Sequence, residues 1–328
     1  MAGVPRISVI VPTQRRPEPL ARALRSVFRQ EGVAPGEVEV VVVDNDLEPT
    51  ACVTVAALQV ETPIPLTCVH EPRPGVASAR NTGVRAAQGA LLAFLDDDQE
   101  APPRWLAELL AARERLGAQV VFSPALAALP PEVRRHRRYF ERFFTYGGPA
   151  REQRVHKGYG VGRCLVERAA LPDRDAPFAV AYDLTGGEDD ELFVRMLENG
   201  VVMGWTPDAW VWEHPSPDRV TLRYAMRRTF TYGQGGTNTP LLHDPPQRVK
   251  AAVSRAVGVV QALVLGAASL ALWLVRQRDR AFVYDKAVRG LGKVLHSPRF
   301  HLQFYGLAPG ERAGTAARAV ETASGHEG

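Results

Sequence analysis

The chain has 328 residues and a formal net charge of +4, with 45% hydrophobic and 23% charged residues. This composition is typical of globular proteins, and the length suffices for one large α/β domain with an appendage or for two domains. The positive excess is small and scattered. It argues against a nucleic-acid partner and is compatible with nucleotides or phospholipid surfaces.

Cysteine usage and the N-terminus bear on the compartment. Cys52, Cys68 and Cys164 have neither a zinc-ligand spacing nor an even count, which favours a reducing compartment. Residues 1–7 lack a basic region followed by an apolar stretch and a cleavage site, so no secretory signal is expected. We therefore expect a cytoplasmic protein.

The first part of the chain alternates between two hydrophobic periods. Short apolar runs predict strands, and apolar residues at helical spacing predict helices between them. The expected strands are residues 7–12, 38–43, 66–69, 91–95 and 119–123, and the expected helices are residues 19–30, 51–60, 76–87 and 105–116. This alternation indicates an α/β fold with a mostly parallel mixed sheet flanked by helices.

The pattern changes after Pro124. Residues 134–138 contain four arginines and are followed by aromatic side chains, which is compatible with a lipid-diphosphate or membrane contact and equally with a surface amphipathic helix. A glycine-rich strand is expected at residues 158–166, a helix at 192–199 and a strand pair at 201–211. The glycines at 158–162 lack the context of a dinucleotide fingerprint, so we interpret them as a close backbone approach to substrate.

Residues 256–275 contain no charged side chain. Twenty residues just suffice to cross a bilayer, but basic residues on both sides give no orientation. The same pattern suits a helix lying in an anionic leaflet, and the remaining alternative is a helix buried against the rest of the fold. We expect membrane association, and we expect residues 309–328 to be a disordered tail.

Three consecutive carboxylates, Asp96, Asp97 and Asp98, directly follow the expected strand at 91–95. Ligands bind beyond the carboxyl ends of strands in open α/β sheets, and crowded carboxylates need a cation or ordered donors. Their oxygens suit Mg²⁺ or Mn²⁺, although an acidic loop is the plain alternative. Thr13 and Asp44 end two neighbouring strands and are expected at the same edge.

A second acidic cluster begins after two glycines, at Glu188 and Asp189. Carboxylates at a helix N-terminus are held ionised by the helix dipole, and one that faces a pocket can act as a general base. His214 follows a later strand and can complete a Mn²⁺ shell, although a lone histidine is more often structural. Arg80 lies in the helix before the triple aspartate and suits a phosphate or a base.

These motifs, in this order, resemble the family-2 glycosyltransferases over roughly residues 5–240. The resemblance rests on residues 9–13, with an arginine and Pro17 after them, and on residues 41–46, 75–89, 94–98, 187–189 and His214. Residues 44–46 read Asp-Asn-Asp, where many members carry Asp-Asp-Gly-Ser, so the match is weaker in that loop.

The resemblance implies the GT-A nucleotide-diphospho-sugar transferase fold, with a domain over residues 1–240 whose nucleotide half ends near 125 and whose acceptor half is 126–240. A helical, membrane-associated extension would follow at 241–308. The implied enzyme is an inverting glycosyltransferase that uses Mn²⁺ or Mg²⁺ and a UDP- or GDP-linked donor. Its acceptor would be a saccharide or a lipid-linked sugar at the inner face of the cell membrane, in surface polysaccharide or glycolipid synthesis.

The resemblance also implies residue roles. The nucleotide sugar would be bound by Thr13, Asp44, Arg80, Asp96 and Asp97. Asp98 and His214 would ligate the metal, Asp189 would be the catalytic base, and Glu188 would bind or orient the acceptor. A sugar-phosphate nucleotidyltransferase is an alternative, although the loop at 12–19 contains no glycine. A non-catalytic membrane- or cation-binding protein is another.

Overall fold

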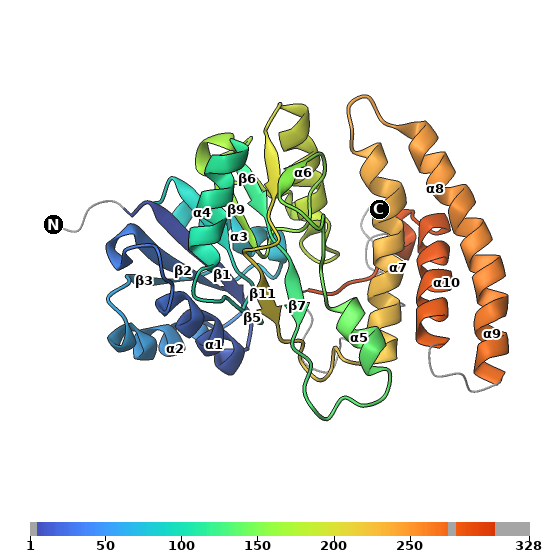
Figure 1. Cartoon of the computed structure of the whole chain (residues 1–328), viewed down its shortest axis with the longest axis horizontal. Coiled ribbons are helices and arrows are strands. Elements are labelled where there is room, and N and C mark those ends of the chain that lie inside the picture. Colours follow the sequence, from blue (N-terminus) through green and yellow to red (C-terminus); the bar gives the residue numbers. More distant parts are fainter. Residues whose placement is uncertain (1–4, 275–279, 306–328) are drawn as a thin grey trace, which may run out of the picture.

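The computed structural model describes residues 5–274 and 280–305 and is built on a mixed eight-stranded sheet (Figure 1). In spatial order its strands are β3 (Leu66–His70), β2 (Val38–Asp44), β1 (Ile7–Thr13), β4 (Leu91–Phe94), β9 (Cys164–Glu167), β6 (Val120–Phe122), β10 (Met203–Trp205) and β8 (Gln153–Val155). The pairings from β3 to β4 are parallel, and β9 runs antiparallel to both of its neighbours. The predicted α/β class and mostly parallel mixed sheet are confirmed.

The parallel half of the sheet is buried on both faces, which explains its continuous valine runs. Val40 and Val42 pack in one core with helices α1 (Pro17–Phe28), α2 (Ala51–Leu58) and α4 (Trp105–Leu116). Val41 and Val43 point the other way, into a core with α3 (Val76–Ala86) and α6 (Glu188–Glu198).

The register brings the predicted strand ends together. Thr13 pairs with Asp44 across β1 and β2, and Ile10 pairs with Phe94 across β1 and β4. The triple aspartate therefore emerges beside the end of β1, because parallel neighbours end at the same edge.

A second sheet has three strands. It contains β5 (Gln99–Glu100), β11 (Val211–Glu213) and β7 (Ala125–Ala127), with β11 in the centre. The prediction of a strand pair at 201–211 is wrong, because β10 lies in the large sheet and β11 in the small one. The glycine-rich strand is also shorter than predicted: only its end, Cys164–Glu167, forms β9.

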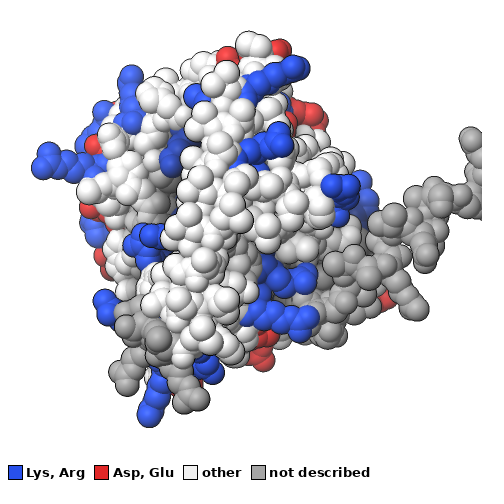
Figure 2. Space-filling view, turned by 90° about the vertical axis from the view of Figure 1, so that its right-hand side faces the viewer, with Lys and Arg blue, Asp and Glu red and all other residues white. Residues whose placement is uncertain are grey.

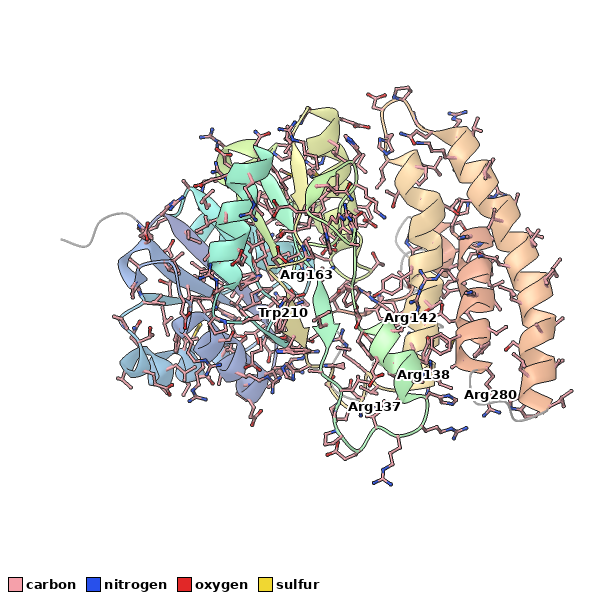
Figure 3. All side chains as sticks on the ribbon, in the orientation of Figure 1. Arg137, Arg138, Arg142, Arg163, Trp210 and Arg280 are labelled. Carbon is pink, nitrogen blue, oxygen red and sulfur yellow. A yellow bond between two sulfur atoms is a disulfide. The ribbon has the colours of Figure 1, made fainter. Side chains whose placement is uncertain are left out.

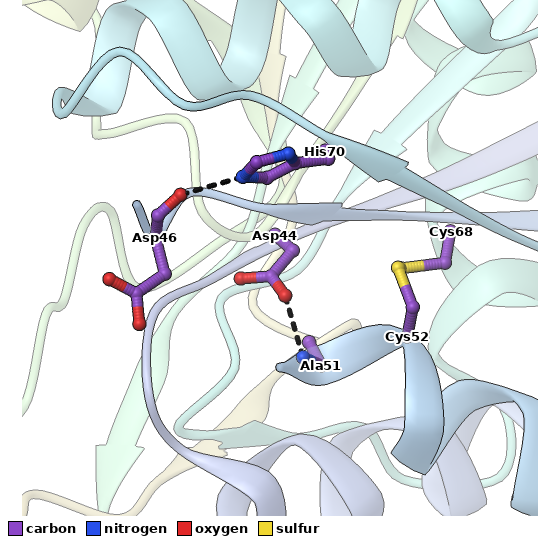
Figure 4. Close-up of a disulfide and its surroundings, with 6 residues drawn as sticks. All are labelled: Asp44, Asp46, Ala51, Cys52, Cys68 and His70. Carbon is purple, nitrogen blue, oxygen red and sulfur yellow. Dashed lines mark hydrogen bonds between the residues drawn. A yellow bond between two sulfur atoms is a disulfide. The ribbon is translucent and has the colours of Figure 1, made fainter. Parts of the chain in front are cut away.

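The disulfide Cys52–Cys68 ties α2 to β3 (Figure 4). The odd cysteine count concealed this pair, since Cys164 is free and buried. The expectation of a reducing compartment does not account for the disulfide, because such bonds persist mainly in oxidising surroundings.

A layer of helices stands apart from the sheet (Figure 1). It contains α7 (Leu222–Asn238), α8 (Arg248–Val260), a π-helical turn (Gln261–Leu265), α9 (Gly266–Leu274) and α10 (Arg280–Val294). Glycines permit close packing here: a Cβ on Gly258 would lie 2.8 Å from the carbonyl oxygen of Gly290. The short helix α5 (Arg137–Phe143) lies between this layer and the sheet.

The apolar segment 256–275 is helical as far as its last described residue, Leu274. Residues 248–274 form a continuous helix, and only 6% of its most apolar window is buried. The alternative of a helix buried on the rest of the fold is therefore wrong. The tail predicted at 309–328 lies outside the described residues.

Candidate active site

A cleft of about 2880 Å³ lies between the carboxyl edge of the large sheet and the helical layer. Asp96, Asp97 and Asp98 line one part of it, and Glu188 and Asp189 line another. The two acidic clusters predicted from the sequence, about ninety residues apart, thus open onto one cavity.

Asp97 is buried and is held by the loop after β1. Thr13 donates a hydrogen bond from Oγ1 to Asp97 Oδ2 at 2.7 Å, and Arg16 Nη1 lies 2.9 Å from Asp97 Oδ1. Burial is the main influence on Asp97, reinforced by the charge of Asp98, and together they raise its pKa to about 6 although Arg16 and Thr13 oppose the rise. The hydrogen bond between Thr13, at the end of β1, and Asp97, just after β4, gives each of these polar side chains a partner.

Asp98 is held by two arginines from different parts of the chain. Arg16 Nη1 lies 3.1 Å from Asp98 Oδ2, and Arg219 pairs with the same oxygen. Glu213, at the end of β11, is buried nearby, and its pKa is raised to about 8, first by burial and then by repulsion from Asp98. Asp98 and Glu213 therefore form a crowded acidic centre that is neutralised by guanidinium groups.

Arg80 connects the two acidic clusters. It is buried on α3, pairs with Glu188, and its Nη2 lies 3.3 Å from Asp96 Oδ1. Asp96 is the most exposed of the three aspartates, with 36% of its side chain accessible. The backbone at Gly162 passes so close to Asp96 that any Cβ there would overlap its carboxylate. Of the glycines at 158–162, Gly162 therefore makes room for Asp96.

The second cluster stands at the beginning of α6. Gly186 and Gly187 have φ angles of +77° and +103°, which favour glycine, and four acidic residues occupy the first helical turn. Burial raises the pKa of Glu188 to about 7 despite its pairing with Arg80. Its Oε2 is buried with no hydrogen-bond partner among the described residues. Asp189 reaches the cleft.

Asp44 is fully buried and does not line the cleft. Its Oδ2 accepts a hydrogen bond from the backbone N–H of Ala51 at 2.6 Å, at the start of α2 (Figure 4). The adjacent Asn45 lines the cleft instead, and its Oδ1 accepts from the backbone N–H of Gly75 at 2.9 Å. The nucleotide-binding role of Asp44 stays a prediction.

His214 also lies outside the cleft lining. Its Nε2 is 3.2 Å from Glu100 Oε2, and its backbone N–H donates to the carbonyl oxygen of Asp98 at 2.8 Å. Across the described ranges, no group of three or more His, Cys, Asp or Glu side chains is arranged to hold a metal ion. The His214 imidazole contacts Glu100, and a metal shared by Asp98 and His214 stays a prediction.

The basic-aromatic stretch begins with an irregular segment and continues as α5. Figure 3 shows Arg138 and Arg142 on this helix, beside α7, and both line the cleft. Tyr139 is buried, and its hydroxyl donates to Asp285 of α10 at 2.9 Å. The stretch therefore contacts the helical layer and also forms one wall of the cleft.

Sequence reasoning missed Arg219 and Glu213. Glu213 lies next to His214, and a single glutamate at a strand end carries no distinctive sequence signal. Arg219 follows a loop of Ser, Pro and Asp residues that carries no periodic pattern. Only the packing of β11 against β5 brings both to Asp98.

Comparison with known proteins agrees with this geometry. Residues 8–174 match the family described as "Glycosyl transferase family 2". The succinoglycan biosynthesis protein ExoM of Rhizobium meliloti (strain 1021) is 33% identical over 228 residues, which cover 70% of this chain and 73% of ExoM. The chain belongs to glycosyltransferase family 2 and is a transferase.

A shorter match is with validoxylamine A glucosyltransferase of Streptomyces hygroscopicus subsp. limoneus, 38% identical over 109 residues, 33% of this chain and 24% of that protein. Among solved structures, the mannosyltransferase PcManGT of Pyrobaculum calidifontis, in complex with GDP-Man and Mn²⁺, has a TM-score of 0.56 at 22% identity. The match covers 88% of this chain and 87% of PcManGT. TarS of S. aureus has a TM-score of 0.51 at 17% identity, covering 88% of this chain and 54% of TarS. These likenesses establish the GT-A fold.

Proposed function

We propose that this glycosyltransferase moves a sugar from a nucleoside-diphosphate donor to a hydroxyl acceptor with inversion, in the synthesis of a bacterial surface polysaccharide or glycolipid. The observation that carries the proposal is that Asp98 and Asp189 open onto the same cleft. ExoM, by its name a succinoglycan biosynthesis protein, supports the polysaccharide setting.

The donor would bind along the edge that contains Thr13, Arg80 and the triple aspartate. Arg16 lies 3.1 Å from Asp98, and Arg219 pairs with the same carboxylate. Guanidinium groups suit the paired oxygens of a diphosphate. Asp96 and Asp97 would contact the sugar and the ribose, and Asp44 would support the base from beneath.

Asp98 and Glu213 supply oxygen donors of the kind that a divalent cation binds, although no three His, Cys, Asp or Glu side chains of the described residues are arranged as its ligands. The pKa of Glu213 is raised first by burial and then by the charges of Asp98 and Asp96, as expected for three carboxylates within electrostatic range of one another. Carboxylate oxygens suit Mn²⁺ or Mg²⁺, and PcManGT binds Mn²⁺ with its GDP-Man. Asp98 would hold the ion, with Asp96, Glu213 or His214 as further ligands. When bound, the ion stabilises negative charge on the departing nucleoside diphosphate.

Asp189 would remove the proton from the acceptor hydroxyl. The acceptor oxygen forms the new bond to the anomeric carbon as the bond to the diphosphate breaks, and attack from the opposite face inverts that carbon. Glu188, held in place by its ion pair with Arg80, would orient the acceptor. Because Arg80 also pairs with Asp96, it would fix the two acidic clusters relative to each other.

The apolar helix would lie in the plane of an anionic membrane surface, at the cytoplasmic face. Figure 2 shows a surface free of charged residues over α8 and α9, with lysines and arginines beside it. Its exposed side chains include Val253, Leu263 and Trp273. The neighbouring α10 carries Arg280, Asp285, Lys286, Arg289 and Lys293, and these charges could not enter the hydrocarbon core alongside a spanning helix.

A thermal-shift screen of UDP- and GDP-linked sugars, with and without Mn²⁺, tests the donor proposal. We expect one sugar nucleotide with Mn²⁺ to raise the melting temperature of the wild type, because a ligand that binds only the folded state stabilises it. Asp98→Ala should lose this rise, and Asp208→Ala, at an exposed carboxylate outside the cleft, should keep it. Absence of a rise with every sugar nucleotide would contradict the proposal.

A further inference from the structure

Arg228, on α7, lines the cleft and has no role in the proposed mechanism. Its guanidinium is stacked among aromatic rings, 4.8 Å from the ring centre of Phe304 and 5.3 Å from that of Tyr232. Its Nη2 donates to the hydroxyl of Tyr305 at 3.3 Å. The rings hold the guanidinium plane in position without neutralising its charge.

Arg228 differs from other arginines of the cleft in its ion pairing, because no carboxylate pairs with its guanidinium directly. Arg16, Arg80 and Arg219 each form ion pairs with acidic residues of the cleft. Arg228 forms no ion pair within 4.0 Å in the part of the chain that the structure describes. A half-buried cation that has no direct carboxylate partner is suited to an incoming anion.

The position of Arg228 relates it to the acceptor side of the cleft. A Cβ on Gly186 would lie 3.7 Å from Arg228 Nη1, so the guanidinium stands beside the glycine pair that leads into Glu188 and Asp189. Arg228 is also near enough to Glu188 to counteract the rise in the pKa of that carboxyl. The donor diphosphate, in contrast, has Arg16 and Arg219 at the other cluster.

From Arg228 the cleft continues toward the apolar helix. Lys286 and Arg289 of α10 line this part, as does Leu265, which lies between α8 and α9. Arg289 is partly neutralised by Asp285 at 3.7 Å. Cationic side chains thus lead from the proposed base to an apolar helix with an exposed face.

Resting on the proposed function, we infer that Arg228 binds a phosphate group of the acceptor, and that this phosphate links the acceptor sugar to a lipid. The hydroxyl to be glycosylated would lie at Asp189, the phosphate at Arg228, and the lipid chain would leave the cleft past Leu265 toward the membrane. A guanidinium suits this task because its planar fork matches phosphate oxygens.

The test measures binding of farnesyl diphosphate, farnesol and inorganic pyrophosphate by calorimetry, with the donor site saturated by the nucleoside diphosphate found in the sugar-nucleotide screen. We expect the wild type to bind farnesyl diphosphate at least about tenfold more tightly than farnesol, as for a charge-assisted hydrogen-bonded pair. Arg228→Gln should abolish this preference and Arg228→Lys should retain part of it. Arg174→Gln, at an exposed arginine outside the cleft, should keep all of it.

The outcomes separate the inference from the proposed function. Equal affinity of the wild type for farnesyl diphosphate and farnesol would overturn the inference, as would an unchanged preference in Arg228→Gln. If inorganic pyrophosphate bound as tightly as farnesyl diphosphate, the lipid link would be wrong. Weaker nucleoside-diphosphate binding in Arg228→Gln would assign the arginine to the donor and also overturn the inference. Failure of the wild type to bind any nucleotide would contradict the proposed function itself.

Discussion

Thr13 and Asp97 are 84 residues apart in the sequence and 2.7 Å apart in the fold. The sequence predicted both at one sheet edge, since polar residues that end parallel strands converge there. It did not predict that Arg16 and Arg219 neutralise Asp98, because ion pairs between distant loops leave no periodic trace. The disulfide partner of Cys52 was hidden for the same reason.

Glu71, just after β3, supports this edge and provides a pH-dependent test. Its carboxylate accepts hydrogen bonds from Arg73 at 3.0 Å and from Thr82 at 2.6 Å, and the Arg73 bond is the main reason why its pKa falls to about 2. Because the folded-state pKa lies below the unfolded value, the stabilisation is complete above about pH 5 and disappears as the pH falls towards 2.

We therefore expect Glu71→Gln to lower the free energy of unfolding by about 1–2 kcal/mol at pH 7, after allowance for the exposure of Arg73. Urea unfolding at pH 7 and pH 3 measures this, and the difference from the wild type should be smaller at pH 3. Glu48→Gln, at an exposed position, serves as the control. An equal loss of stability at both pH values would show that the charge of Glu71 is not responsible.

Among the secondary-structure elements, the apolar helix 248–274 gives the clearest test of membrane binding. Its inner face contacts α10 and α7, and its outer face exposes side chains such as Val257, Leu263 and Trp273. An in-plane helix binds through apolar burial and through attraction of basic residues to anionic lipid.

We expect Leu263→Glu to reduce sedimentation of the protein with vesicles that contain anionic phosphatidylglycerol by about tenfold, because a charge would enter the acyl boundary. High salt should also weaken binding, since screening shortens the reach of the basic residues. Val53→Glu, an equally apolar and exposed position on α2, should sediment like the wild type. Retention of the Leu263→Glu variant at the wild-type level, or resistance of the wild type to carbonate extraction, would contradict an in-plane helix.

The elements of residues 7–123 were predictable to within a few residues. Their valine-rich strands and amphipathic helices follow the two hydrophobic periods closely, as in β2 (Val38–Asp44) and α4 (Trp105–Leu116). Prediction failed where close packing replaces periodicity. Residues 158–162 form a loop in which Gly162 makes room for Asp96, and β11 pairs with β5 and β7 instead of with β10.

At the scale of the whole molecule, the cleft is formed by three parts that fold from distant segments. The sheet edge contributes Asp98, the start of α6 contributes Asp189, and the helical layer contributes Arg228. Helix α7, inside the range predicted for the glycosyltransferase domain, packs mainly on α10. The domain boundary predicted at residue 240 stays a prediction, but the cleft depends on helices from both sides of it.

The central claim is that one cleft binds the donor at Asp98 and activates the acceptor at Asp189. The most direct measurement compares donor affinity and sugar transfer in one variant, Asp189→Asn, using the sugar nucleotide found by thermal shift. We predict donor affinity within about threefold of the wild type and a loss of transfer of at least about a hundredfold, as for removal of a general base. Transfer at the wild-type rate, or loss of donor binding together with transfer, would contradict the account.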